Sequence, residues 1–147
     1  MIHLQNNKVI GDVTTAAVGS TSTATLVVDT VGYDYASIEV IRGNNASTVF
    51  ANVLKVGESD TTSSYSDVTA LVGGGTGGFT VPGVAAANTA NAAIFKFDVD
   101  CKSRKRYLQV SFTPGASVTT AIVARLGRGE LNPATATDAN LVGWVKG

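Results

Sequence analysis

The sequence predicts an all-β protein, an antiparallel β-sandwich or jelly-roll-like barrel of about seven to eight strands with extended terminal arms. Three observations lead to this class. Apolar and polar residues alternate in several short runs, which is the side-chain period of a half-buried strand. Gly, Asn, Ser and Pro separate these runs, and the chain has 16 Gly, a composition that favours many turns. No long run shows the period of a helix.

The clearest pair of runs covers residues 93–100 and 107–112, where apolar side chains stand at every second position. Each run therefore has one apolar face and one polar face. A short loop joins them, so we expect a hairpin in which Phe97 faces Leu108. The rest of the chain is expected to supply further strands that cover the apolar face of this hairpin.

Further strands are expected before and after this pair. They are residues 24–31, 35–42, 47–56, 65–72 and 118–126, of which 65–72 also fits a turn of helix. Residues 73–92 are rich in Gly and Ala, and such a loop tends to stay mobile unless a partner holds it.

The chain is expected to form one domain with three parts: an N-terminal arm (residues 1–23), a β-sandwich domain (24–133) and a C-terminal arm (134–147). Within the N-terminal arm, Val9, Ile10 and Val13 are candidates for a short edge strand.

The surface is predicted to be poor in charge. Only 15% of residues are charged, against about 25% in ordinary globular chains. This composition suits a protein whose surface is partly covered by copies of itself or by another protein. The formal net charge is zero, so we expect neither a nucleic-acid partner nor a membrane partner. The first residues lack the apolar run of a signal peptide, which predicts synthesis in a cytoplasm.

Catalytic chemistry has few candidate residues. The single histidine, His3, lies in the N-terminal arm, and the single cysteine, Cys101, lies at the end of a predicted strand. Neither has the partner residues that activate a nucleophile. Cys101 is expected to point inward as an unreactive thiol. The alternative is a reactive thiol whose pKa is lowered by the nearby Lys and Arg residues. We therefore expect no enzyme, no cofactor and no metal site.

Two other patterns have a structural interpretation. Gly73, Gly75 and Gly78 match the spacing of a dinucleotide-binding loop, but Pro82 follows where that motif needs a helix. Asp98 and Asp100 lie on one face of a strand without a calcium-loop pattern, so they are expected to face solvent.

The basic turn is the sharpest local feature. Lys102, Arg104, Lys105 and Arg106 are four of the 11 basic residues and fall within five positions. Three interpretations compete: a solvated hairpin tip, a nucleic-acid contact, and a contact with an acidic protein surface through bidentate Arg–carboxylate pairs. In the expected hairpin Lys105 faces Asp100, and Arg106 is held at the rim of the apolar face.

The only tryptophan, Trp144, lies in the C-terminal arm between glycines and apolar residues. Two interpretations are open. The ring packs back on its own sheet, or it anchors in a pocket of a neighbouring protein, where tryptophan is a common anchor. Together with the four residues of the basic turn, Trp144 completes the predicted protein interface.

Five segments resemble a family of small head structural, decoration or cement proteins of tailed bacteriophages. They are residues 35–40 (YASIEV), 54–60 (LKVGESD), 64–68 (SYSDV), 97–108 (FDVDCKSRKRYL) and 124–126 (ARL). The resemblance spans residues 24–133, excludes the tail that holds Trp144, and includes no catalytic motif.

The resemblance implies a role in the virion. We expect a protein that decorates and stabilises the capsid shell by binding the major capsid protein, located on the capsid surface, with a homo-oligomer, for example a trimer, as the bound form. A vertex or tail component is a variant of this hypothesis. The alternative from another class is a carbohydrate-binding or adhesin module, for which Tyr33, Tyr35 and Tyr65 are the candidate aromatic platform.

Overall fold

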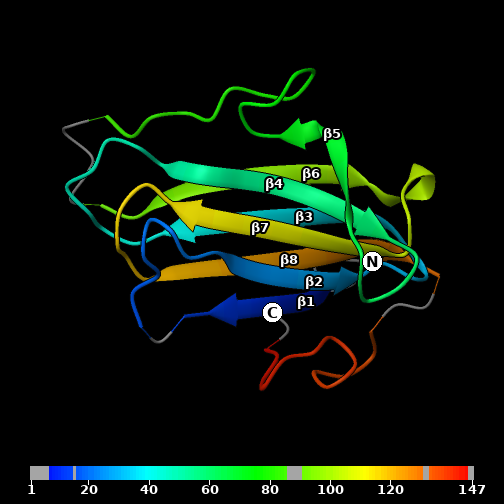
Figure 1. The fold of residues 1–147 in the computed structure, drawn as a ribbon. Coiled ribbons are helices and arrows are strands. Elements are labelled where there is room, and N and C mark those ends of the chain that lie inside the picture. The colour runs from blue at the N-terminus through cyan, green and yellow to red at the C-terminus, as the bar shows by residue number, and fades with distance from the viewer. Residues whose placement is uncertain (1–6, 15, 86–90, 131–132, 146–147) are drawn as a thin grey trace.

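The computed structural model of the chain describes residues 7–14, 16–85, 91–130 and 133–145. In these ranges the chain forms eight strands and one short 3₁₀ helix, with no α-helix (Figure 1). The elements are β1 (Lys8–Val13), β2 (Ala24–Asp29), β3 (Tyr33–Arg42), β4 (Ala51–Ser59), β5 (Ser66–Val72), β6 (Ala93–Asp100), η3 (Cys101–Ser103), β7 (Tyr107–Pro114) and β8 (Thr120–Gly129).

The strands form two four-stranded sheets with the orders β1-β8-β3-β6 and β2-β7-β4-β5. All neighbouring strands are antiparallel. The pairs β4–β5, β3–β6, β2–β7 and β1–β8 enclose one another along the chain, so the backbone is one long antiparallel ribbon rolled into two sheets. Such a rolled ribbon of eight strands is a jelly roll. The predicted antiparallel β-sandwich is therefore confirmed.

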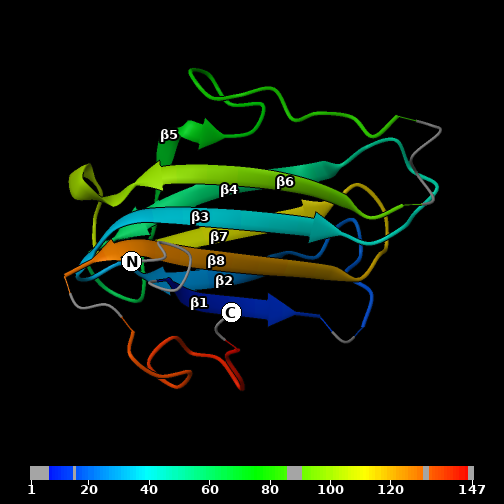
Figure 2. The same cartoon turned by 180° about the vertical axis from the view of Figure 1, so that it is seen from behind.

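The core lies between the two sheets, which Figures 1 and 2 show from opposite sides. Phe97 and Val99 of β6 are buried there, as are Leu108, Val110 and Phe112 of β7. These are the apolar positions of the alternating runs, so the predicted inward faces are correct. Burial of one large apolar side chain contributes roughly 1.5–3 kcal/mol.

Residues 93–112 do not form the expected hairpin. Strand β6 pairs with β3 in one sheet, and β7 lies between β2 and β4 in the other. Phe97 is opposite Ile38, and Leu108 is opposite Val28. Alternation reveals which face of a strand is buried. Because both sheets bury their inner faces in the same core, two strands packed face to face have the same pattern as two strands side by side.

Both terminal segments pack on one edge of the sandwich. Strand β1, inside the predicted N-terminal arm, pairs with β8 along its whole length. The chain then continues to a bridge between Val18 and Val118. From the C-terminal segment, the Ala139 carbonyl accepts a hydrogen bond from the Val9 amide at 2.9 Å, and the Asn140 side chain donates to the Val9 carbonyl at 2.8 Å. The outer edge of β1 is therefore partly covered by the same chain.

The glycine-rich segment is held by its own chain over its described part. The Gly73 amide donates to the Leu54 carbonyl at 2.9 Å, and the Phe79 amide donates to the Val72 carbonyl at 3.2 Å. The Phe79 ring stacks on Phe95 at 5.2 Å between centroids. Contacts within the chain thus give this loop a defined path without a partner. Residues 65–72, for which a turn of helix was the other expectation, supply strand β5.

Candidate functional site: the basic turn and its surroundings

The basic turn connects the two sheets at one end of the sandwich. It begins at η3, where the Asp100 carboxylate accepts a hydrogen bond from the Lys102 amide at 3.0 Å. This is the usual capping role of an aspartate before a helical turn. The expected contact between Asp100 and Lys105 belongs to the hairpin that does not form, and Lys105 instead approaches Asp60. The turn carries the chain across the core from one layer to the other.

Three cations of the turn have acidic partners from distant parts of the same chain. Lys102 lies 3.6 Å from Asp34, Arg104 lies 3.6 Å from Glu58, and Lys105 lies 3.6 Å from Asp60. These separations exceed those of a direct charge-assisted hydrogen bond. Pairs of this kind on a protein surface contribute about 0–1 kcal/mol, so a partner's carboxylate can displace them at small cost.

Arg106 is held more firmly. Its Nε and terminal nitrogen donate to the two carboxylate oxygens of Asp29, at 3.0 and 2.8 Å. The hydrogen bond from Arg106 lowers the pKa of Asp29 below its ordinary value, against an opposing effect of burial. The Arg106 carbonyl also accepts bonds from the amide and the hydroxyl of Thr30, at 2.9 and 2.8 Å. Arg106 therefore joins the end of β2 to the start of β7.

Cys101 points inward, as predicted. It is buried, and its thiol faces the Val99 carbonyl at 3.7 Å. Burial, with a smaller effect of the Asp100 charge, raises the pKa of the Cys101 thiol to about 11. The nearby cations do not produce the lowered pKa that the reactive-thiol alternative requires.

A shallow recess lies on β3 and β6 beside the basic turn. Its lining includes Tyr35, Ser37, Asp98 and Asp100, and its volume is about 430 Å³. Tyr35 is exposed, but Lys102 lies 5.3 Å from its ring centroid. A further cation, that of Arg128, lies 5.6 Å from the same centroid. Cation–π contacts of this kind compete with a ligand for the ring.

The other two predicted platform tyrosines are half-buried. Tyr33 packs in part against the core, and Tyr65 has a buried hydroxyl. Tyr33 and Tyr35 lie in β3 and Tyr65 lies in the loop before β5, and of the three only Tyr35 is exposed.

Trp144 is half-buried in the C-terminal segment, next to exposed Val142 and Val145. This segment returns to the edge of β1 through the hydrogen bonds of Ala139 and Asn140 with Val9. The five residues of the predicted interface thus lie in two places on the molecule.

The carboxylates of Asp98 and Asp100 both have partners within the chain. Lys96 lies 2.9 Å from Asp98 on the same strand, and Asp100 caps η3. Across the described part of the chain, no group of three or more His, Cys, Asp or Glu residues is arranged to hold a metal ion. His3 lies outside the described residues.

Sequence reasoning missed Arg42, which is 1% exposed. Its guanidinium donates to the carbonyls of Asn45, Ser47 and Val49, each at 2.9 Å, so one side chain shapes the loop after β3. Arg42 follows Ile38 and Val40 at the alternate positions of β3 that are buried. This alternation was the available signal that its side chain points inward.

The fold and these contacts define a jelly-roll protein with a filled core and a charged turn braced by its own acidic residues. Comparison with protein-family models, curated proteins and solved structures finds no match. The resemblance to phage head proteins therefore remains a prediction. In the described residues, no helix has the length and apolar character to cross a bilayer.

Proposed function

We propose that the protein is a virion structural protein of a tailed bacteriophage, which decorates the capsid shell by binding the major capsid protein and thereby stabilises the shell. The jelly-roll ribbon is the observation that carries this proposal, because this architecture recurs in virus capsid domains. A fold alone does not determine function, and the resemblance of five segments to phage head proteins adds the second line of support. The protein is made in the host cytoplasm and resides on the capsid surface.

The basic turn is the proposed contact with the shell. Lys102, Arg104 and Lys105 have exposed or half-buried side chains whose acidic partners lie 3.6 Å away. Carboxylates on the capsid replace these weak partners, whereas Arg106 stays bound to Asp29 and keeps the turn in place. Each single contact is weak, and several contacts per bound copy or oligomer act together through a high effective concentration.

The C-terminal segment is the second proposed contact. Trp144 is half-buried and is flanked by Val142 and Val145, both fully exposed. Aromatic side chains with exposed apolar neighbours are typical of interface anchors. Deleting residues 141–147 should lower the affinity for the shell, and a lower melting temperature of the free protein would instead place Trp144 in the protein's own core.

Attachment to purified heads of the phage that encodes this chain tests the proposal. Lys105→Ser should reduce the number of bound copies severalfold at low salt. Lys55→Ser is the matched control, because Lys55 is a lysine of β4 outside the basic turn that pairs with Asp67 of the neighbouring strand β5. Equal occupancy of both variants and the wild type would remove the turn from the contact. Failure of the wild type to bind heads would overturn the proposed function itself.

A carbohydrate-binding module is the second candidate, and the recess beside Tyr35 is the observation that favours it. An aromatic ring, a hydroxyl and two carboxylates line this recess, and such groups recognise sugars. Jelly rolls also occur in lectins. Binding to a glycan array that Tyr35→Ala abolishes, together with no binding to heads, would establish this candidate instead.

A further inference from the structure

One end of the jelly roll carries no charged residue in its loops. We define this charge-free end as the described residues 14, 16–23, 43–50, 82–85, 91–92 and 115–119. None of the 11 basic and 11 acidic residues falls in these segments. The opposite end contains the basic turn and its acidic partners. The chain as a whole has 15% charged residues, so their absence from these segments shows an uneven distribution of charge between the two ends.

The described parts of these four segments form one continuous surface. Val18 and Val118 exchange backbone hydrogen bonds of 2.8 and 3.1 Å, and the Gly43 amide donates to the Thr119 carbonyl at 2.9 Å. The Val84 amide donates to the Thr48 carbonyl at 2.7 Å. Figures 1 and 2 show the corresponding loops gathered at the end of the sandwich opposite η3.

The one cation at this end does not reach the surface. Arg42 is 1% exposed, and its guanidinium is bound by three carbonyls of the loop 43–50. The described loop residues at this end therefore offer hydroxyls, amides, backbone groups and apolar side chains. The exposed Asp12 of β1 lies next to them, because it lines a recess together with Thr14 and Val18.

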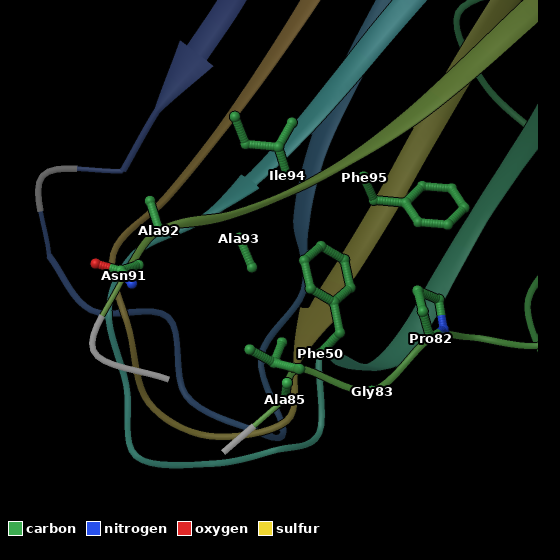
Figure 3. A pocket seen from close by; sticks show the side chains of 10 residues that line it. Phe50, Pro82, Gly83, Ala85, Asn91, Ala92, Ala93, Ile94 and Phe95 are labelled. Atoms are coloured by element: carbon green, nitrogen blue, oxygen red, sulfur yellow. The ribbon is translucent and has the colours of Figure 1, made fainter. Parts of the chain in front are cut away.

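Exposed apolar side chains border a recess on this surface. Ile94 is 64% exposed and Val49 is 47% exposed. The recess has a volume of about 340 Å³, and Phe50, Pro82 and Phe95 are among its lining residues. Figure 3 shows the rings of Phe50 and Phe95 at this recess, with Ile94 beyond them on the same strand as Phe95. A protruding aliphatic group beside a recess lined by aromatic rings supplies both halves of a self-complementary contact.

We propose that the charge-free end binds a second copy of this chain. A surface of one charge sign repels its own copy, whereas an uncharged surface of donors, acceptors and methyl groups can face itself. The zero net charge of the chain removes the long-range repulsion between copies. The cores of homodimer interfaces are likewise depleted of charge.

A specific interface buries about 800 Å² on each partner, which is roughly a tenth of the 7965 Å² surface of this chain. The inference is independent of capsid binding, which is assigned to the opposite end and the C-terminal segment.

Sedimentation equilibrium of the purified full chain tests the inference. At about 100 µM protein, the wild type should sediment with a mass above that of one chain. The association should persist between about 0.1 and about 1 M NaCl, because the loop residues of the charge-free end carry no charge. Ile94→Asp should weaken association more than about a hundredfold, since an unpaired charge would be buried.

Val31→Asp is the matched control, because Val31 is 58% exposed and lies in a turn at the opposite end. It should associate as the wild type does, and far-UV circular dichroism should show that all variants remain folded. Val49→Asp repeats the test at a second position of the charge-free end. A monomeric wild type at this concentration would overturn the inference, as would unchanged association in both the Ile94→Asp and Val49→Asp variants or loss of association in Val31→Asp.

Discussion

Arg106 and Asp29 are joined by two parallel hydrogen bonds, 3.0 and 2.8 Å long, across 77 residues of chain. The pair fixes the last residue of the basic turn to the end of β2. Of the four cations of the turn, Arg106 is thus held by two short hydrogen bonds, whereas the other three have carboxylate partners 3.6 Å away. This division is the structural basis for assigning the capsid contact to Lys102, Arg104 and Lys105.

Asp29→Asn should lower stability in a pH-dependent way. The carboxylate of Asp29 has a folded pKa below its ordinary value of 3.8, so its contribution is present above that value and is lost as pH falls through the folded pKa. Urea unfolding should show the variant to be less stable than the wild type at pH 7, and the gap should close in acid below pH 3.8. A gap of unchanged size in acid would contradict this role of the pair.

Arg42→Met should lower the free energy of unfolding by about 2–4 kcal/mol, because three backbone carbonyls lose a charged donor. The loop 43–50 should also become more sensitive to proteolysis. Arg125→Met is the control, since Arg125 is exposed and forms a surface pair with Glu39; its effect should stay below about 1 kcal/mol. Equal effects of the two substitutions would show that the guanidinium does not hold the loop.

Cys101 should react slowly with a thiol reagent in the folded protein. A rise in pKa from 9.0 to about 11 reduces the thiolate fraction near neutral pH by about a hundredfold, and burial slows access further. Labelling with a chromogenic disulfide in native buffer and in denaturant measures the ratio. Rapid labelling of the native protein would restore the reactive-thiol hypothesis.

Gly78→Ala should destabilise the fold by about 1–3 kcal/mol. A Cβ at position 78 would overlap the backbone carbonyl of Val72, which cannot move independently of β5. Gly19→Ala is the control, because the nearest atom to its added Cβ is the Ser22 hydroxyl at 3.8 Å, an ordinary contact. Thermal unfolding should separate the two variants. A neutral Gly78→Ala would mean that the loop 73–78 tolerates a displaced backbone.

Much of the fold was predictable from the sequence because alternation is a local property. The stretch expected to begin a strand at residue 93 supplies β6, and the inward faces of β6 and β7 were assigned correctly. The edge-strand candidates Val9, Ile10 and Val13 lie in β1. The sandwich domain was predicted to begin at residue 24, whereas the sheet already includes β1. This short polar segment gains its strand conformation only from hydrogen bonds to β8, more than 100 residues away in the chain.

The basic turn was also visible in the sequence, but its partners were not. Asp29, Asp34, Glu58 and Asp60 lie in three separate segments, each ordinary when considered alone. Nothing local indicates that the strands carrying them end at the same side of the sandwich. The charge-free end had a signal in the sequence, the lack of charge in four separate segments, but only the topology places those segments together.

The sequence by itself determined roughly where most of the strands lie, which of their faces are apolar and where the cations cluster, since these follow from spacing and side-chain chemistry. Tertiary structure alone decided which strands pair. Residues 93–112 have the pattern of a hairpin, yet β6 and β7 belong to different sheets, because both inner faces are buried in one core and alternation is the same for either arrangement. That same choice brings the basic turn beside its acidic partners and collects the uncharged loops at the other end.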